Sequence, residues 1–207
     1  MPNSGDYVNA LRRVFDRRAA RKRALTEPIR ILGVMGSSRQ DGNTAALMGA
    51  VFQNLNDARW IDLSDYSIAP YAYDHRFADD DFLPIAKIMR EAEIIVYASP
   101  VYWYSMSAQL KAFFDRLTDL TEGEAKAIGK ALAGKKTFVI STGGASDAPA
   151  SFERPFSDTA RYFDMSWGGL FYAAMQSSAL SPETKRAAEA FARQIASAPA
   201  APAVKAA

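Results

Sequence analysis

The sequence predicts an α/β protein in which a five-stranded parallel sheet carries helices on both faces, the doubly wound arrangement. Three observations support this fold class. Strand-like and helix-like segments alternate from residue 28 onward, as in βα units that build one parallel sheet. The strand-like segment 94–98 is a continuous apolar run, which is typical of a strand buried on both faces, and 137–140 has the pattern of another buried strand. Right-handed crossovers between parallel strands then restrict the topology to the doubly wound class.

Each element is predicted from its apolar pattern. The expected strands are short and apolar, and they cover residues 29–35, 60–63, 94–98, 137–140 and 167–173. Apolar side chains recur at helical spacing between them, which predicts helices over residues 44–55, 81–91, 107–120, 155–163 and 181–197. Ser181 and Pro182 suit the N-cap and first turn of the last helix. Ligands in such sheets bind beyond the carboxyl ends of the strands, so the loops after the first, third and fourth strands are the expected functional region.

Composition excludes several classes of site. The chain has 207 residues, 49% of them apolar, which fits one domain with a sizeable core. It contains no cysteine, so disulfides, thiolate-held zinc or iron–sulfur sites and a cysteine nucleophile are excluded. No apolar run approaches the roughly 18 residues that span a bilayer, and the first residues lack the apolar core of a secretory signal. We therefore expect no membrane span and a cytoplasmic location.

The net charge of +2 is unevenly distributed along the chain. Residues 1–27 carry seven Lys/Arg and three Asp/Glu, a net charge of +4, which leaves −2 for the other 180 residues. The main body is therefore nearly neutral overall, and nothing in it indicates a nucleic-acid groove.

We expect three regions along the chain. Residues 1–27 form a basic extension in which 7–25 have the pattern of an amphipathic helix, residues 28–197 form the domain, and residues 198–207 form an Ala/Pro-rich disordered tail. The basic helix suits a membrane surface or an acidic partner; the alternative is packing on its own domain or on a second subunit. Packing is favoured because the apolar face is short and because Asp6 and Asp16 dilute the charge.

The loop after the first strand has the features of an anion site. It reads Gly36-Ser37-Ser38-Arg39-Gln40-Asp41-Gly42-Asn43-Thr44 and opens directly into a helix. The free N–H groups and the dipole at a helix start favour an anion, and Arg39 adds a guanidinium suited to phosphate. The loop is neither a Walker A nor a Gly-x-Gly-x-x-Gly sequence. An ordinary polar turn with Asn43 as N-cap is the alternative, but the position after the first strand favours phosphate.

Two further loops are candidate ligand walls. Pro100-Val101-Tyr102-Trp103-Tyr104 follows the third strand. Three consecutive aromatic side chains are costly to expose to solvent, so we expect a ligand or another protein surface to cover them. They suit either a planar ring system or a core or subunit contact. Ser141-Thr142-Gly143-Gly144-Ala145-Ser146 follows the fourth strand, where adjacent glycines indicate a tight turn or the close approach of a ligand.

These motifs together resemble the NAD(P)H-dependent FMN reductase family. The loop from Gly36 to Thr44 is similar to the family's phosphate loop, and residues 99–116, from the Pro-x-Tyr-Trp turn to the Leu-Lys-x-Phe-x-Asp-Arg helix, are similar to its second signature. The resemblance covers about residues 29–175. It implies a flavodoxin-like three-layer fold, bound FMN, and NADPH or NADH as co-substrate. The FMN-binding residues that it implies are Ser37, Arg39, Gly42, Asn43, Thr44, Pro100, Val101, Tyr102, Trp103, Tyr104, Ser141, Thr142, Gly143 and Gly144.

The function that the resemblance implies is electron transfer from NAD(P)H through FMN to a small acceptor, which is a flavin, a quinone, an azo compound or a metal oxyanion. Hydride transfer to a flavin needs no protein acid or base, so no catalytic residue is expected. The family also implies a homodimer or homotetramer. One alternative is a flavodoxin-type electron carrier without its own NAD(P)H oxidation, although such carriers are strongly acidic. A second is a non-redox interaction protein that works through its basic N-terminal helix.

The single histidine, His75, lies in a loop with several aspartates. A histidine beside carboxylates is compatible with a metal site or an acid/base pair. We expect instead a solvated loop in which Asp80 or Asp81 caps the following helix. Some relatives carry a cysteine cluster for iron–sulfur in this region, a subtype that the absence of cysteine excludes.

Overall fold

A computed structural model describes residues 29–77 and 79–199. The predicted N-terminal helix lies outside this part of the chain, as does the tail beyond residue 199. Within it, no helix is both long and apolar enough to cross a membrane.

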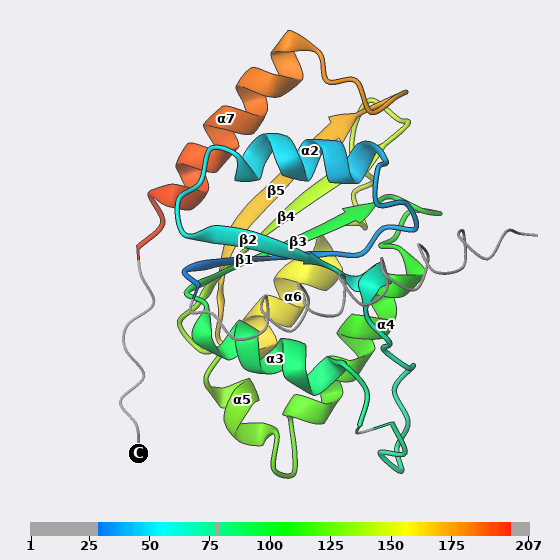
Figure 1. The fold of residues 1–207 in the computed structure, drawn as a ribbon, viewed down its shortest axis with the longest axis vertical. Coiled ribbons are helices and arrows are strands. Elements are labelled where there is room, and N and C mark those ends of the chain that lie inside the picture. Colours follow the sequence, from blue (N-terminus) through cyan, green and yellow to red (C-terminus); the bar gives the residue numbers. More distant parts are fainter. Residues whose placement is uncertain (1–28, 78, 200–207) are drawn as a thin grey trace, which may run out of the picture.

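Five parallel strands form one sheet with the order β2-β1-β3-β4-β5 (Figure 1). They are β1 (Ile31–Met35), β2 (Ala58–Asp62), β3 (Ile94–Pro100), β4 (Lys136–Gly143) and β5 (Ser166–Ala174). The chain therefore winds outward in both directions from β1, and the predicted doubly wound fold is confirmed. The direction of winding changes between β1 and β3, which is where ligands bind in sheets of this type.

Helices cover both faces of the sheet (Figure 1). One face carries α2 (Asn43–Phe52) and α7 (Pro182–Ala196); the other carries α3 (Phe82–Glu91), α4 (Ala108–Arg116), α5 (Lys126–Lys130) and α6 (Arg154–Tyr162). Two 3-10 turns, η1 (Leu63–Asp65) and η2 (Leu117–Leu120), complete the described elements. The predicted helix over 107–120 is thus an α-helix to Arg116 and a 3-10 turn beyond it. Ser181 caps α7 as expected, since its side chain accepts the Thr184 N–H.

The fourth strand is longer than predicted. We expected a loop from Ser141, but β4 continues to Gly143 because Ser141 and Thr142 pair with Ser99 and Pro100 at the extended end of β3. The Ser141 hydroxyl donates to the Ser99 carbonyl over 2.8 Å. Small hydroxyl side chains are therefore satisfied inside the sheet, where the sequence alone indicates a loop.

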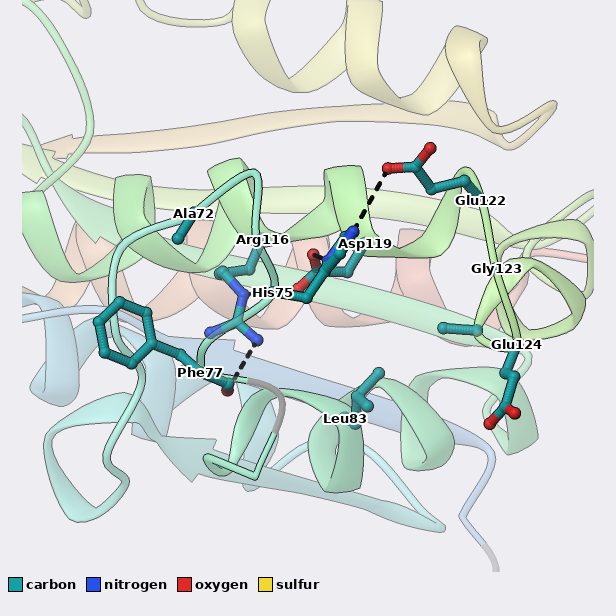
Figure 2. Close-up of a pocket in the computed structure, with 10 residues that line it drawn as sticks. Ala72, His75, Phe77, Leu83, Arg116, Asp119, Glu122, Gly123 and Glu124 are labelled. Carbon is teal, nitrogen blue, oxygen red and sulfur yellow. Dashed lines mark hydrogen bonds and ion pairs between the residues drawn. The ribbon is translucent and has the colours of Figure 1, made fainter.

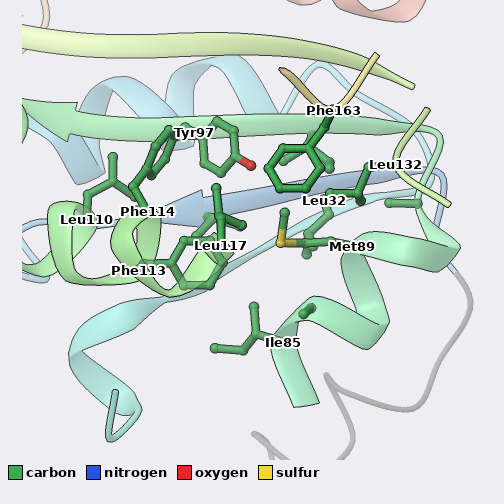
Figure 3. Close-up of a cluster of buried hydrophobic side chains, with 14 of the residues drawn as sticks. Leu32, Ile85, Met89, Tyr97, Leu110, Phe113, Phe114, Leu117, Leu132 and Phe163 are labelled. Carbon is green, nitrogen blue, oxygen red and sulfur yellow. The ribbon is translucent and has the colours of Figure 1, made fainter. Parts of the chain in front are cut away.

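The larger apolar core lies between the sheet and the α3–α6 face, and Figure 3 shows its aromatic and aliphatic side chains. Tyr97 of β3 packs against Phe114 of α4 with ring centroids 4.8 Å apart. Its hydroxyl is buried without a hydrogen-bond partner among the described residues, and burial raises the pKa of this phenol. On the opposite face, a Cβ at Gly33 would lie 2.2 Å from Met48, so glycine in β1 lets α2 pack closely on the sheet.

Candidate functional site

The loop between β1 and α2 is seated on two neighbouring elements. The Gly36 N–H donates to the Ala98 carbonyl of β3 over 2.8 Å, and the Ser107 hydroxyl before α4 donates to the Gly36 carbonyl over 2.7 Å. A Cβ at Gly36 would lie 2.6 Å from the Cβ of Leu110. Glycine therefore allows the loop to rest directly on α4, which fixes the position of the residues that follow.

The N-terminus of α2 is open to a ligand. Gly42 is the N-cap, and no side chain in the described part of the chain caps this end, so the first N–H groups have no intrahelical partner. The predicted alternative, Asn43 as N-cap, is wrong: Asn43 is the first helical residue, and its amide donates to the Met175 carbonyl over 3.0 Å. The Arg39 side chain lies beside Gly42, with Nε 3.3 Å from the position of a Cβ there.

A cleft of about 180 Å³ lies in front of this helix end. Its lining comes from the ends of β3, β4 and β5 as well as from the loop, and it comprises Ser37, Arg39, Gly42, Asn43, Thr44, Pro100, Val101, Tyr102, Thr142, Gly143, Gly144 and Met175. Three predicted residues do not line it. Ser141 is buried in β4, and Trp103 and Tyr104, which follow the lining residue Tyr102 in the sequence, have 93% and 69% of their surface exposed.

The cleft is suited to a phosphate group. Its lining supplies the helix N–H groups, the Arg39 guanidinium and hydroxyl groups, and no lining residue is a carboxylate. The Thr44 hydroxyl is held 2.8 Å from the Thr142 hydroxyl, which ties the helix start to β4. Charged donors and an uncapped helix N-terminus in one cleft are the chemistry that binds a phosphate monoester.

The aromatic loop after β3 forms a strained two-residue turn. The Tyr102 and Ser105 backbones exchange hydrogen bonds of 2.9 and 3.0 Å, and the central residues Trp103 and Tyr104 have φ values of 48° and 67°. Glycine or asparagine is preferred at such positions, whereas bulky residues there are unusual and cost energy. The Tyr102 hydroxyl lies 3.0 Å from the Ser38 hydroxyl, which links this turn to the phosphate loop.

The two glycines at the end of β4 differ in their surroundings. A Cβ at Gly143 would lie 2.6 Å from the hydroxyl of Tyr172, which itself donates to the Ala145 carbonyl over 2.7 Å. A Cβ at Gly144 would meet no atom within 4 Å. Gly143 is thus required by packing, and Gly144 opens onto free space at the cleft.

One lining residue, Met175, was not predicted from the sequence. It follows β5, and its N–H donates to the Gly143 carbonyl over 2.9 Å. The signal that could have found it is the sheet order, because β5 ends beside β4 at the same edge.

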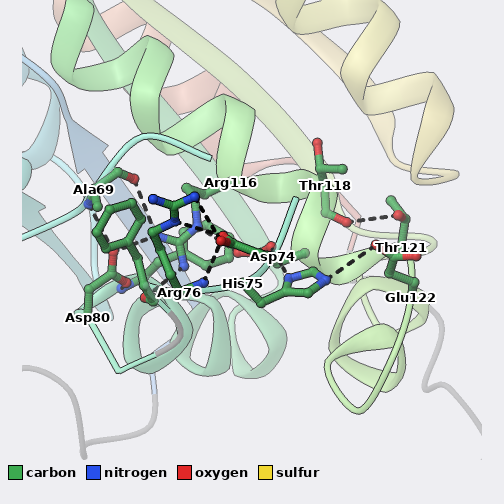
Figure 4. Close-up of polar contacts among 12 residues, drawn as sticks. Ala69, Asp74, His75, Arg76, Asp80, Arg116, Thr118, Thr121 and Glu122 are labelled. Carbon is green, nitrogen blue, oxygen red and sulfur yellow. Dashed lines mark hydrogen bonds and ion pairs between the residues drawn. The ribbon is translucent and has the colours of Figure 1, made fainter. Parts of the chain in front are cut away.

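His75 lies away from the cleft in a separate polar network (Figure 4). Its side chain is about half exposed, and Nδ1 lies 3.3 Å from Oδ1 of Asp119. Of the two aspartates expected to cap α3, Asp80 accepts a hydrogen bond from the first helical residue: its Oδ1 accepts the Phe82 N–H over 2.9 Å. Within the described ranges, His, Asp and Glu side chains form no group of three that could hold a metal ion.

The centre of that network is Arg116, whose side chain is 3% exposed. It forms ion pairs with Asp80 and, over 2.6 Å, with Asp119, and it donates to the carbonyls of Ala69 and Phe77 over 3.2 and 3.3 Å. The last residue of the predicted Leu-Lys-x-Phe-x-Asp-Arg segment therefore organises the 66–81 loop, not the cleft.

Fold and cleft together define a flavodoxin-like α/β protein with a cleft suited to an anion at the carboxyl edge of its sheet. The chain belongs to the NADPH-dependent FMN reductase family, whose model matches residues 29–165. Its class is accordingly that of NAD(P)H-dependent oxidoreductases with FMN as cofactor, as the resemblance implied.

One curated relative agrees with this assignment, and solved structures share the fold. A putative NAD(P)H-dependent FMN-containing oxidoreductase, YwqN of Bacillus subtilis, is 32% identical over 124 residues, which cover 56% of this chain and 67% of that protein. The curated relatives are matched over 45% to 67% of their own lengths. The Trp repressor binding protein of Bacillus subtilis has the same fold, with a TM-score of 0.63, 23% identity, and coverage of 83% of this chain and 100% of its own. General stress protein 14 of Treponema denticola, solved in complex with FMN, has a TM-score of 0.54 and 20% identity over 80% of this chain and 95% of its own.

Proposed function

We propose that this chain transfers electrons from NADPH or NADH through FMN to a small acceptor, and that the FMN phosphate binds at the N-terminus of α2. The observation that carries the proposal is the uncapped helix end, which opens with Arg39 into a cleft without carboxylates. An isolated polar turn would cap its own helix instead.

Each part of the site has a separate role in this proposal. Ser37, Arg39, Asn43 and Thr44 surround the phosphate. The backbone of Pro100–Tyr102 and of Gly143–Gly144 flanks the flavin ring. The Val101 and Tyr102 N–H groups already donate to the Thr142 and Ser105 carbonyls, so the Gly144 N–H is the group that stabilises negative charge on the ring. When bound, FMN supplies the redox chemistry by accepting hydride from nicotinamide and delivering electrons to the acceptor.

The exposed aromatic turn is proposed to serve the co-substrates. Trp103 and Tyr104 stand at the rim of the cleft in strained conformations, where a flat ring can stack on them. This favours planar acceptors such as a flavin, a quinone or an azo compound over a metal oxyanion. A homodimer or homotetramer and a cytoplasmic location belong to the same proposal, and the exposed aromatics are suited to a subunit contact as well.

The phosphate site is tested by Arg39→Ala. Loss of a charged hydrogen bond weakens binding by about 1.5–3 kcal/mol, so we expect the Kd for FMN to rise about 10- to 150-fold. Arg154→Ala is the matched control, because that arginine lies on α6 with 82% of its side chain exposed. If the Arg39→Ala protein binds FMN as tightly as the control, Arg39 does not contribute to FMN binding.

The reductase activity is tested by anaerobic addition of NADPH or NADH to the FMN-loaded protein. We expect the flavin absorption near 450 nm to bleach within one turnover and to return when a quinone is added. If neither nucleotide bleaches the flavin but a chemical reductant does, the protein is a flavodoxin-type carrier and not a reductase.

A further inference from the structure

A second and larger cavity, of about 310 Å³, lies between the 66–81 loop and the segment that joins α4 to α5 (Figure 2). Its walls are mostly apolar and include Ala72, Phe77, Leu83 and Ala125. The phosphate cleft shares no lining residue with it. The family function described above leaves this cavity without a role.

The surface around the cavity is strongly acidic. Residues 74–77, 79–81 and 115–124, here called the acidic face, carry eight carboxylates and two arginines, a net charge of −6 with His75 neutral. Lys111 pairs with Asp115 of this set, which leaves −5. The two segments are held together by the Arg116–Asp80 and His75–Asp119 contacts. The near-neutral body inferred from composition therefore conceals a concentrated negative charge.

Carboxylates at the mouth of the cavity lack a strong cationic partner. Arg116 is already occupied by Asp80 and Asp119. Glu122 has 60% of its side chain exposed and lies 3.7 Å from the nearest His75 nitrogen. Glu124 is exposed and forms no ion pair with any residue in the described ranges. An occupant with apolar side chains and several cationic groups would complement both the cavity and its rim.

We propose that residues 1–28 of the same chain dock on the acidic face. Residues 1–27 have a net charge of +4, and their apolar positions Tyr7, Leu11 and Phe15 recur at helical spacing among arginines. One aromatic side chain of this stripe fits a cavity of this volume, and neighbouring arginines then reach Glu122 and Glu124. This inference does not depend on which molecule the flavin reduces.

The length of the segment permits this contact. Twenty-eight residues span up to about 90 Å when extended, and a helix over residues 7–25 would be about 28 Å long. A domain of this size is on the order of 40 Å across. A segment tethered to the domain also has an effective concentration near the millimolar range. The acidic face therefore competes well against a membrane surface or a separate acidic partner.

Cross-linking of the full chain tests the docking directly. Lys22 is the one lysine among residues 1–28, so a carbodiimide joins it to whichever carboxylate lies nearest. We expect an intrachain link from Lys22 to a carboxylate of the acidic face, reduced at least fivefold by Glu122→Lys with Glu124→Lys. The matched control is Glu183→Lys with Glu189→Lys on α7, which should leave the link unchanged. Adding Arg17→Glu and Arg18→Glu to the variant with Glu122→Lys and Glu124→Lys reverses the charges on both sides and should restore the docking. Restored protection of residues 71–77 against hydrogen exchange would further support the proposal.

Several results would overturn the proposal. Links from Lys22 that are spread evenly over the α7 carboxylates would show no preference for the acidic face. Links only between isotopically distinct chains would show that a second copy is the occupant. Protection of residues 1–28 only in the presence of anionic phosphatidylserine vesicles would show that the segment binds membranes.

Discussion

Replacing Arg116 with methionine removes a buried cation while keeping most of the side-chain volume. In the wild type this guanidinium neutralises Asp80 and Asp119, whose side chains are only 11% and 13% exposed. It also stacks on the Phe82 ring at 5.0 Å and donates to two loop carbonyls. Methionine preserves the contact with Phe82 but leaves two largely buried carboxylates without a counter-charge.

The expected loss of stability follows from this geometry. Breaking a buried ion pair by removing one partner costs about 3–5 kcal/mol, because the remaining charge is left uncompensated. For a domain of this size, each kcal/mol lowers Tm by about 2–4 °C. Arg116→Met should therefore lower Tm by about 6–20 °C at a fixed FMN concentration, since bound ligand itself raises Tm.

Thermal unfolding followed by circular dichroism measures Tm, and urea unfolding measures the free energy of unfolding. Arg154→Met is the control, because its ion pair with Asp158 is exposed and such pairs contribute at most about 1 kcal/mol. If Arg116→Met is no less stable than Arg154→Met, the ion pairs and hydrogen bonds of Arg116 do not stabilise the 66–81 loop.

Three further predictions concern single side chains. Gly143→Ala should lower both thermal stability and, at least fivefold, FMN affinity, because the added Cβ would lie 2.6 Å from the Tyr172 hydroxyl. Gly144→Ala, with free space around it, should leave the fold intact; equal thermal stability of the two variants would contradict this. Burial raises the pKa of the Asp62 carboxyl, so the folded state binds more protons and stability falls as pH rises through the interval above 3.8. Asp62→Asn should then raise Tm at pH 7 by an amount that disappears below pH 3.8; a constant difference across this range would exclude the mechanism. Trp103→Gly should not reduce stability, because glycine relieves a left-handed conformation that costs about 1–2 kcal/mol. The same change should raise KM for the acceptor. A stability loss above about 1 kcal/mol would show that the indole is structural.

The fold was predictable from sequence because each strand and helix carries its own apolar pattern. The run from Ile94 to Ala98 is apolar except for the Tyr97 hydroxyl, and it forms most of β3. The position of the loop from Gly36 to Thr44 at an open cleft was predictable for a similar reason, since its glycines, hydroxyls and arginine lie close together in the sequence.

Features that depend on distant residues could not be read in this way. The extension of β4 through Ser141 requires pairing with the far end of β3, and α5 has only five residues, with Gly129 packed against the Leu120 carbonyl. The Arg116–Asp80 pair joins residues 36 positions apart. A local pattern carries no signal for such a contact.

The nine-residue helix α4 supports a different loop at each of its ends. At its start the Ser107 hydroxyl supports the phosphate loop through Gly36, and at its end Arg116 anchors the 66–81 loop. The exposed tip of that loop, residues 72–77, can therefore change length or composition during evolution while the cofactor loop keeps its place.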